Sequence, residues 1–582
     1  MSPPFGSPLY PPRLRPGTVT PDRLLPPIPE RRRPLTRIER PAVPPFPPVT
    51  LPATLPELLD DAIASLGDAP FLGVRTSTTR ELSMTYREFG VAVDNASARL
   101  AAAVDPGARV MVQGAPGPGF AAVLFAAARA NVVLVPLDAR MTADTIDRIA
   151  GQTSPSAVIL GTGATLEPVT IPRLAALPVL DLDDITDTAL PADLAALAMR
   201  RTTPADQPIE ILFTSGSTGN PKGVTVTQAM LLASTERCLR TIPAGRNRFV
   251  SILPLSHIME QVAGLIYAVA AGAETAYRTT LRPDVIAAAI KGHRATALVV
   301  VPPVLELLFS AIRREADKSG KGKTFRRALR IAPHLPIRLR RRLFRKVHEA
   351  MGGELALVLC SAAYLPAGLQ HSWEALGVDV VQGYGSTEAG LVATNFRGDA
   401  PHDRVGWVLP PLEIRIEPDG EVVARGPSVF GGYWNNPEAN ADAFTADGWY
   451  RTGDYGELDA RGALRLVGRT RSLIALPNGM NVHPEDLEAA LAAAGIVEPV
   501  VYESEPGTIA FAYRPGASFS ETQADEAAAL RTALKTANRR LAAHQRIAGM
   551  APFPEPDFPR THTRKVQRSA VAAQMAGVPL TR

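Results

Sequence analysis

The segment ILFTSGSTGNPKGVTVT, Ile211 to Thr227, interrupts an apolar run with ten residues of Thr, Ser, Gly, Asn, Pro and Lys before apolar character resumes. Gly216, Gly219 and Gly223 permit backbone angles and close approaches that side chains would block. Successive backbone N–H groups, together with the Ser and Thr hydroxyls, would line a concavity with donors that suit a triphosphate. The spacing differs from that of the P-loop, which disfavours ordinary kinases and NTPases. A flexible Ser/Gly turn is the alternative.

Lysine is rare in this chain, since only 8 of the 62 basic residues are lysines. Lys222 in the Gly-rich segment and Lys565 in FPRTHTRKVQR go against that preference for arginine. A compact ammonium and a planar guanidinium are not interchangeable, so a lysine among arginines indicates a site that needs the smaller group. A chance surface lysine is the alternative at each position.

Length and composition indicate a soluble globular protein with more than one domain. The chain has 582 residues, beyond the roughly 250 to 300 at which a single core stops growing. Cys238 and Cys360 lack the spacing of a zinc site or a disulfide framework, which favours a reducing compartment. The N-terminus has no apolar secretory region, and the apolar windows are short or interrupted. We therefore expect a cytoplasmic protein.

Two basic regions stand apart from the rest of the sequence. Residues 1–50 hold 16 Pro and 8 Arg against 3 acidic residues, which predicts a disordered extension outside the fold, with a membrane or partner contact as the alternative. Residues 323–346 hold ten Lys or Arg and no acidic residue, interleaved with Leu, Ile and Phe. This pattern indicates a basic amphipathic segment with either a solvated face or a peripheral contact with anionic lipid. Nucleic acid is not expected, because no recognition motif accompanies the charge.

The order of helical and strand patterns predicts the fold class. Over residues 51–200, Ala-rich helical stretches alternate with short apolar runs, which indicates an α/β sheet with crossover helices. EIRIEPDGEVVARG (413–426) and GELDARGALRLVG (456–468) read as hairpins, and NVHPEDLEAALAAAG (481–495) as a helix that starts near Pro484. We predict a large N-terminal domain of α/β layers with a β-rich distal part, residues 51–468, and a small mobile α+β C-terminal domain, residues 469–582.

Four motifs carry a resemblance to a known family. TSGSTGNPKG (214–223) resembles the phosphate loop of the adenylate-forming superfamily, to which the acyl-CoA synthetases belong. QGYGSTEAG (382–390) resembles its adenine motif, GWYRTGDYGELDARGALRLVGR (448–469) its ribose and hinge region, and PRTHTRK (559–565) its catalytic lysine motif. The four occur in the family's order. The chain is identified as a member over about residues 51–568, and VGRTRSLIALPNGMNVHPEDLE (467–488) resembles the long-chain fatty acid CoA ligases of the family.

The resemblance implies an acid-thiol ligase. In the family, ATP and a carboxylate give an acyl-adenylate and pyrophosphate, and a thiol, usually that of coenzyme A, then takes the acyl group. ATP, Mg²⁺, coenzyme A and a medium- to long-chain fatty acid are thus the expected cofactors and substrates. One alternative is a fatty acyl-AMP ligase that delivers the acyl group to a separate acyl carrier protein. Another is a non-catalytic nucleotide-binding scaffold.

The resemblance also assigns roles in nucleotide binding. It implies that one set of residues holds the phosphates: Thr214, Ser215, Gly216, Ser217, Thr218, Gly219 and Lys222. It also implies that Thr218 and Glu388 bind magnesium, because their oxygens suit a hard cation. Gly383, Tyr384 and Gly385 would hold the adenine.

The remaining nucleotide contacts fall to residues in three of the motifs. Asp454 and Arg469 would bind the ribose, because a carboxylate accepts and a guanidinium donates. Thr387 would contact the α-phosphate. Lys565 would stabilise the charge that develops at the α-phosphorus. The hinge GRTRSL (468–473) would re-aim the small domain between half-reactions.

The acyl site is implied by two shorter segments. LPLSHIMEQVAGL (253–265) resembles the segment whose histidine lies beside the acyl pocket. The resemblance thus implies that His257 lies at that pocket and is a catalytic residue. CSAAYLP (360–366) resembles the small-residue strand that lines the pocket, with Ser361, Ala362 and Ala363 leaving room. Amino-acid-activating relatives carry an aspartate near this histidine, and none occurs in the segment, which favours an apolar acyl chain. A buried histidine satisfied by hydrogen bonds is the alternative for His257.

Overall fold

The computed structural model describes most of the chain from residue 49 to residue 581. The residues described are 49–75, 81–189, 202–214, 221–242, 247–278, 282–395, 401–469, 474–475, 481–482, 484–505, 507–519, 525–541, 545–560 and 566–581. The expected N-terminal extension, the tip of the phosphate loop, the residues after Arg469 in the hinge, and Lys565 therefore lie outside the described residues.

A six-stranded sheet forms around the Gly-rich segment. Its strands are β3 (Arg109–Gln113), β4 (Val133–Pro136), β5 (Ala157–Leu160), β6 (Val179–Asp181), β7 (Pro208–Thr214) and β8 (Lys222–Thr227). Their order is β6-β5-β3-β4-β7-β8, with parallel pairing up to β7 and an antiparallel β7–β8 hairpin. The parallel part requires crossover helices, as the alternating sequence pattern predicts.

A second sheet of 13 strands runs through the same part of the chain. Its strands are β1 (Pro70–Arg75), β2 (Glu81–Thr85), β9 (Arg248–Ser251), β10 (Glu274–Tyr277), β11 (Ala297–Val300), β12 (Leu357–Cys360), β13 (Asp379–Ser386), β14 (Gly390–Thr394), β15 (Gly406–Val408), β16 (Glu413–Ile416), β17 (Glu421–Arg425), β18 (Tyr450–Leu458) and β19 (Ala463–Arg469). The order is β16-β17-β18-β19-β15-β14-β13-β12-β11-β9-β10-β1-β2.

This large sheet changes character along its width. The strands from β13 to β1 pair in parallel, and those from β14 to β16 pair antiparallel. All four residues of β12 are buried, as expected for a parallel strand covered on both faces. The β16–β17 and β18–β19 pairs confirm the two hairpins predicted from the sequence. The α/β class with a β-rich distal part is thus confirmed.

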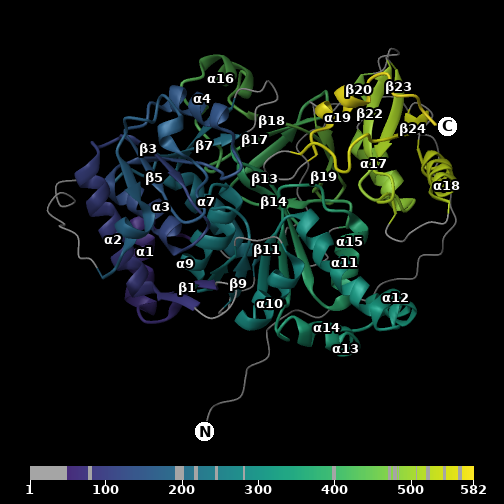
Figure 1. Cartoon of the computed structure of the whole chain (residues 1–582), viewed down its shortest axis with the longest axis horizontal. Helices are drawn as coiled ribbons and strands as arrows, with labels where there is room; N and C mark the ends of the chain where they lie inside the picture. Colours follow the sequence, from purple (N-terminus) through teal and green to yellow (C-terminus); the bar gives the residue numbers. More distant parts are fainter. Residues whose placement is uncertain are drawn as a thin grey trace, which may run out of the picture. The chain divides into compact units, whose positions relative to one another are not determined.

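Helices cover both sheets (Figure 1). They are α1 (Leu55–Leu66), α2 (Tyr86–Ala103), α3 (Pro118–Ala130), α4 (Ala143–Thr153), α5 (Leu182–Thr186), α7 (Gln228–Thr241), α8 (Ile258–Glu260), the π-helix η2 (Gln261–Ile266), α9 (Tyr267–Ala271), α10 (Pro283–His293), α11 (Pro302–Lys318), α12 (Gly322–Ile331), the 3-10 turn η3 (Ala332–His334), α13 (Ile337–Leu343), α14 (Arg345–Ala350), α15 (Ala367–Leu376) and α16 (Pro437–Ala443). Capping boxes start α1 and α2, in which Thr54 and Thr85 exchange hydrogen bonds with Glu57 and Glu88. None of the described helices is long and apolar enough to cross a bilayer.

The C-terminal segment has cores of its own. Its elements are β20 (Ile474–Ala475), β21 (Asn481–Val482), α17 (Pro484–Ala493), β22 (Val500–Glu505), β23 (Thr508–Tyr513), α18 (Glu526–Asn538), β24 (Gly549–Pro552) and α19 (Arg568–Met575). Helix α17 begins at Pro484, where the sequence predicts it. Two apolar clusters draw only on residues 474–580, and two others only on residues 51–466. The domain boundary at residue 469 and the mobility of this segment remain predictions.

Candidate active site

Polar and small residues follow the carboxyl ends of several parallel strands. Asp138 comes shortly after β4, and Thr214 is the last residue of β7. His257 follows β9, Ser361 follows β12 directly, and Thr387 follows β13 directly. In α/β sheets, ligands bind outside the carboxyl ends of the strands. The topology therefore assembles a candidate site from segments that are far apart in the sequence.

The two ends of the Gly-rich loop are held by the β7–β8 hairpin. Thr214 pairs with Lys222 in its register, and the Thr214 hydroxyl lies 3.5 Å from the Lys222 carbonyl oxygen. A Cβ on Gly223 would lie 2.6 Å from the Ile211 side chain, so this position needs glycine. Ser215, Gly216, Ser217, Thr218 and Gly219 lie outside the described residues. The hairpin fixes where the loop begins and ends.

Tyr433 links the loop to the predicted magnesium carboxylate. Its hydroxyl donates a hydrogen bond to Oε1 of Glu388 across 3.1 Å, and Nζ of Lys222 lies 5.1 Å from the centre of its ring. A cation at this distance is attracted to the face of the ring. The backbone supports this arrangement, since Phe430 donates to the Glu388 carbonyl across 2.7 Å and Tyr433 forms a bridge with Val224.

Sequence reasoning did not select Tyr433. The local sequence does carry a sign of a functional loop. FGGYWNNP (430–437) places aromatic residues among Gly and Asn in a region with no apolar periodicity. Residues of these types in an irregular segment are typical of a loop that carries function. The contact with Glu388 itself depends on the three-dimensional structure.

Tyr384 on β13 and Asp454 on β18 meet although β14, β15 and β19 stand between these two strands in the order of the large sheet. Both side chains are buried, and the Tyr384 hydroxyl donates to Oδ2 of Asp454 across 2.7 Å. Register places Arg469 opposite Asp454 on the β18–β19 pair, although the Arg469 side chain lies outside the described residues. A Cβ on Gly385 would lie 2.0 Å from the Gly390 carbonyl oxygen, so the adenine motif turns too tightly there for a side chain. The adenine and ribose residues of the prediction are thus brought together.

His257 lies beside an aspartate that comes from a distant strand. Its Nε2 is 3.3 Å from Oδ2 of the buried Asp138. Arg140 donates to both oxygens of Asp138, at 2.8 and 2.6 Å. Burial alone would raise the pKa of Asp138, but the hydrogen bonds from Arg140 and His257 override it and hold that pKa well below its usual range. The carboxylate is therefore charged and paired with Arg140.

This contact revises one step of the sequence argument. No aspartate occurs near His257 along the chain, yet Asp138 reaches it through the fold. The preference for an apolar acyl chain therefore rests on the pairing of Asp138 with Arg140 and not on the absence of a carboxylate.

The small-residue segment lies against the adenine motif. A Cβ on Gly383 would lie 3.4 Å from Oγ of Ser361. Ser361 and Ala363 are half-buried, and Ala362 is exposed. Ala362 has φ +70°, a left-handed conformation that is uncommon outside glycine. The segment thus turns sharply beside the nucleotide residues.

Two carboxyl groups near His257 are fully buried. Glu260 lies three residues after His257 in the sequence, and Glu210 contacts Gln261. Glu210 on β7 accepts a hydrogen bond from Nε2 of Gln261 across 2.9 Å. Burial raises the pKa of Glu210 and that of Glu260 to about 8 each. A Cβ on Gly264 would lie 1.9 Å from Oε1 of Glu260, so any larger residue there would have to displace the Glu260 carboxyl. Both carboxyls are uncharged at neutral pH.

The metal prediction rests on Glu388. Within the described residues no group of three or more His, Cys, Asp or Glu side chains could hold an ion. Mg²⁺ is commonly held by one or two carboxylates together with substrate phosphates, and it keeps several waters. A single carboxylate beside the phosphate loop therefore fits a magnesium ion that arrives with the nucleotide.

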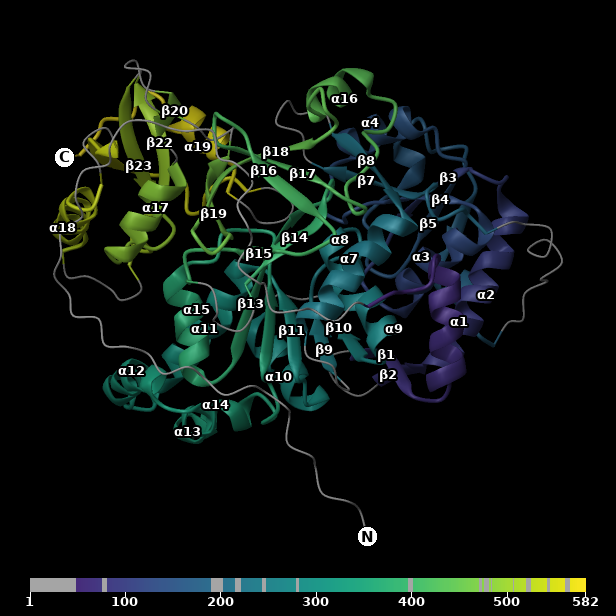
Figure 2. The ribbon, with the colours of Figure 1, turned by 180° about the vertical axis from the view of Figure 1, so that it is seen from behind.

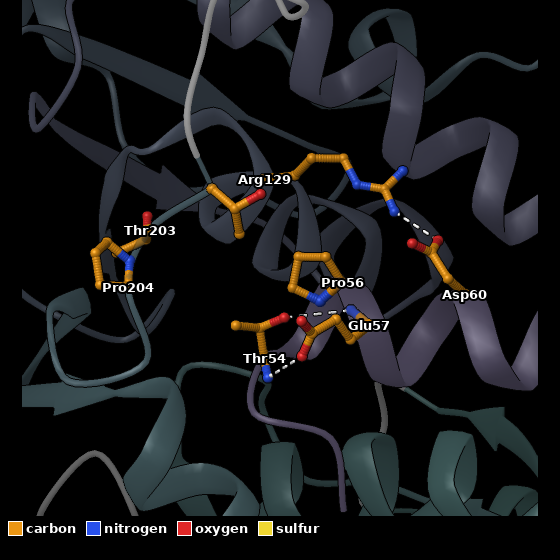
Figure 3. Close-up of a pocket in the computed structure, with 8 residues that line it drawn as sticks. Thr54, Pro56, Glu57, Asp60, Arg129, Thr203 and Pro204 are labelled. Atoms are coloured by element: carbon orange, nitrogen blue, oxygen red, sulfur yellow. Dashed lines mark hydrogen bonds and ion pairs between the residues drawn. The ribbon is translucent and has the colours of Figure 1, made fainter.

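A pocket of about 420 Å³ lies elsewhere on the large part of the chain (Figure 3). Thr54, Glu57, Asp60, Arg129 and Thr203 are among the residues that line it. Arg129 pairs with Asp60 at 2.7 Å, and Thr54 and Glu57 form the capping box of α1. These four polar side chains of the pocket thus satisfy one another, and none of the predicted site residues lines it.

Comparisons with known proteins agree with the fold. The profile described as AMP-binding enzyme matches residues 59–434. The long-chain-fatty-acid–CoA ligase FadD15 of Mycobacterium bovis is 31% identical over 345 residues, 55% of this chain and 56% of that protein. The (7a-methyl-1,5-dioxo-octahydro-1H-inden-4-yl)propanoyl:CoA ligase of Mycobacterium tuberculosis is 30% identical over 498 residues, 80% and 90% of the two chains. ATP-bound MatB from Rhodopseudomonas palustris has a TM-score of 0.70 and 24% identity, covering 90% of this chain and 99% of that one. The chain spans just over half the length of the first of these relatives.

Proposed function

The chain belongs to the family of AMP-binding enzymes, and we propose that it is an AMP-forming acyl-CoA synthetase for fatty acids. In the first half-reaction a carboxylate oxygen attacks the α-phosphorus of ATP and expels pyrophosphate. In the second, the thiol of coenzyme A attacks the acyl carbonyl carbon and expels AMP. The observation that carries the proposal is the junction at β13, where Tyr384 contacts Asp454 and Glu388 contacts Tyr433 beside Lys222.

Each residue at this junction has a task that its chemistry supports. Tyr384 and the two neighbouring glycines offer a ring and a flat surface to the adenine. Asp454 accepts hydrogen bonds from the ribose hydroxyls, and Lys222 attracts the phosphates. Glu388 and Thr218 would hold Mg²⁺, which supplies positive charge against the phosphate oxygens when bound. Thr387 and Lys565 would contact the α-phosphate, where negative charge develops.

The pairing of Asp138 with Arg140 supports an uncharged acyl chain. A substrate ammonium needs a carboxylate that is not already satisfied, and Asp138 receives two hydrogen bonds from Arg140. Opposing charges held in this way leave the region beside His257 with little net charge. Several relatives act on fatty acids by their names, which supports a medium- to long-chain substrate.

Mass spectrometry of the products tests this proposal. The protein is incubated with ATP, Mg²⁺, coenzyme A and a mixture of short, medium and long fatty acids. Acyl-CoA with AMP supports the ligase and ranks the acyl chains. Acyl-adenylate that accumulates without thioester would instead support a fatty acyl-AMP ligase that requires a separate acyl carrier protein. ATP binding without pyrophosphate release would support a non-catalytic scaffold.

A further inference from the structure

The basic segment near residue 330 folds into α12, η3, α13 and α14. Its elements lie beside one another at the margin of the large part of the chain, next to α15 and near the amino ends of β12 and β13, whereas the candidate site residues follow the carboxyl ends of these strands (Figures 1 and 2). Within the described residues, six of its basic side chains make no ion pair: Lys323, Arg327, Arg330, Arg338, Arg342 and Lys346. The segment therefore presents unneutralised positive charge.

Helix α13 is attached to the fold by arginines. None of its residues is buried. Arg340 donates to the main-chain carbonyls of Pro333, Leu335 and Glu374 at 2.8, 2.8 and 3.1 Å. Arg341 likewise donates to the carbonyls of Gly353, Leu355 and Gly377, at 3.0, 2.8 and 3.1 Å. Polar side chains thus face the protein, contrary to the usual arrangement of a surface helix.

The aliphatic side chains of this region face solvent instead. Ile337, Leu339 and Leu343 on α13 are 41%, 49% and 48% exposed, and Ile331 at the end of α12 is 48% exposed. These four are among only ten large apolar side chains that are exposed in the described residues. Single exposed apolar residues are normal, but a group of them indicates an interaction surface. In the sequence, each of these four aliphatic residues is adjacent to Arg330, Arg338 or Arg342.

We propose that α12, η3 and α13 form a docking surface for membranes that carry anionic lipid headgroups. The unpaired arginines and lysines are attracted to the headgroup phosphates and carboxylates. The aliphatic side chains enter the boundary between headgroups and acyl chains, where a basic amphipathic helix lies in the plane of the membrane. A purely solvated face would account for the charge but not for the aliphatic group. The proposal does not depend on the catalytic activity.

Vesicle flotation of the full-length protein tests the surface. The probes are vesicles of phosphatidylcholine alone and vesicles with about one third phosphatidylglycerol. We expect flotation only with the anionic vesicles, and release at high salt because the attraction is screened. Arg338→Gln with Arg342→Gln should lower the partition coefficient roughly 25-fold, at about fivefold per charge. Leu339→Ser with Leu343→Ser should lower it at least about tenfold.

The variants keep Arg340 and Arg341, which hold the helix in place. Arg531→Gln on α18 with Arg539→Gln, directly after that helix, is the charge-matched control, because both residues are exposed and lie in another part of the chain. Val169→Ser is the apolar control, since Val169 is 79% exposed. Both controls should float like the unchanged protein, and circular dichroism should show that all variants are folded.

Four results would overturn the proposal. One is the absence of flotation with anionic vesicles. Another is equal flotation with neutral and anionic vesicles. The third is an equal loss in the charge-matched control, which would attribute binding to net charge and not to this surface. Binding to duplex DNA that exceeds vesicle binding and is lost in the same variants would reassign the surface to nucleic acid.

Discussion

The phenolic hydroxyl of Tyr384 donates a hydrogen bond to Oδ2 of Asp454 across 2.7 Å, although the two residues are 70 positions apart in the sequence. The bond joins the strand of the adenine motif to the strand of the ribose motif. Asp454 is held in one orientation before any nucleotide arrives, so less freedom would be lost if it accepts a ribose hydroxyl as predicted. The contact thus gives Tyr384 a positioning role in addition to its predicted role as a surface for the base.

Tyr384→Phe tests this positioning. The substitution keeps the ring and removes the donor to a carboxylate, a bond worth roughly 1.5 to 3 kcal/mol. We expect the KM for ATP to rise about tenfold with a smaller change in kcat. Discrimination against 2′-deoxy-ATP should also weaken, because a poorly oriented Asp454 reads the ribose less well. Kinetics with both nucleotides measures the two effects.

Tyr502→Phe is the matched control for that substitution. Tyr502 is buried in the C-terminal segment, and its hydroxyl has no hydrogen-bond partner within the described residues. Its loss should leave both nucleotide constants unchanged. A Tyr384→Phe enzyme that keeps full discrimination against 2′-deoxy-ATP would contradict the positioning role.

Tyr433 serves two predicted functions that substitutions can separate. Tyr433→Phe removes the hydrogen bond to Glu388 but keeps a ring beneath Lys222. The Mg²⁺ concentration for half-maximal activity should rise at least about tenfold, since a hydrogen bond to a carboxylate contributes roughly 1.5 to 3 kcal/mol. Tyr433→Leu also removes the ring and should additionally raise the KM for ATP. Equal magnesium dependence of Tyr433→Phe and the unchanged enzyme would rule out the link to Glu388.

Arg140 provides a test of the acyl preference. Arg140→Ala leaves Asp138 without its two strongest hydrogen bonds, so the carboxylate beside His257 becomes available to a substrate ammonium. The ratio of kcat/KM for an ω-amino fatty acid to that for the matched unsubstituted acid should rise severalfold. Arg148→Ala on α4, an exposed pair with Asp144, is the control and should leave the ratio unchanged. An unchanged ratio in Arg140→Ala would place Asp138 outside the acyl site.

The buried carboxyl of Glu210 should make the stability of the protein depend on pH. Its pKa is raised from 4.5 to about 8 in the folded protein, because burial disfavours the charged form. The folded state then holds the proton more tightly than the unfolded state. The stability that this tighter proton binding contributes is complete below about pH 4.5 and is lost as the pH rises to about 8. The free energy of unfolding should therefore fall across that interval.

Glu210→Gln removes this titration and keeps the shape of the side chain. The variant should be more stable than the unchanged protein at pH 8.5, by roughly 1 to 3 kcal/mol once water penetration is allowed for. The two proteins should be similar at pH 5. Urea unfolding from pH 5 to 9 measures both, with the exposed Glu167→Gln as control. A slope that Glu210→Gln leaves unaltered would mean that this carboxyl is ionised in the fold.

Sequence patterns predicted the parts of the molecule that depend on local chemistry. The hairpin at Asp419–Gly420 and the start of α17 at Pro484 follow from turn and helix-start preferences. The contacts of Tyr433 with Glu388 and of Asp138 with His257 could not be predicted in this way. Each joins segments whose proximity depends on strand order, and no property of either segment specifies its neighbour in the sheet.

Lys565 remains the residue on which the chemical step is predicted to depend. It is one of only 8 lysines in the chain and stands among arginines. Attack on the α-phosphorus builds negative charge on the phosphoryl oxygens, and a positioned ammonium stabilises it. Lys565→Ala should therefore slow adenylation about 10²- to 10³-fold. Transfer from supplied acyl-adenylate to coenzyme A should continue, because AMP leaves an acyl carbon in that step and no pyrophosphate is expelled.

Lys565→Arg separates the charge of this residue from its shape. If the site needs a compact ammonium, the guanidinium restores only part of the adenylation rate although it keeps the positive charge. Pyrophosphate release reports the first half-reaction, and thioester formation from synthetic acyl-adenylate reports the second. Equal losses in both half-reactions for Lys565→Ala would refute the separate role of this lysine. Full activity of Lys565→Arg would show that charge alone suffices at this position.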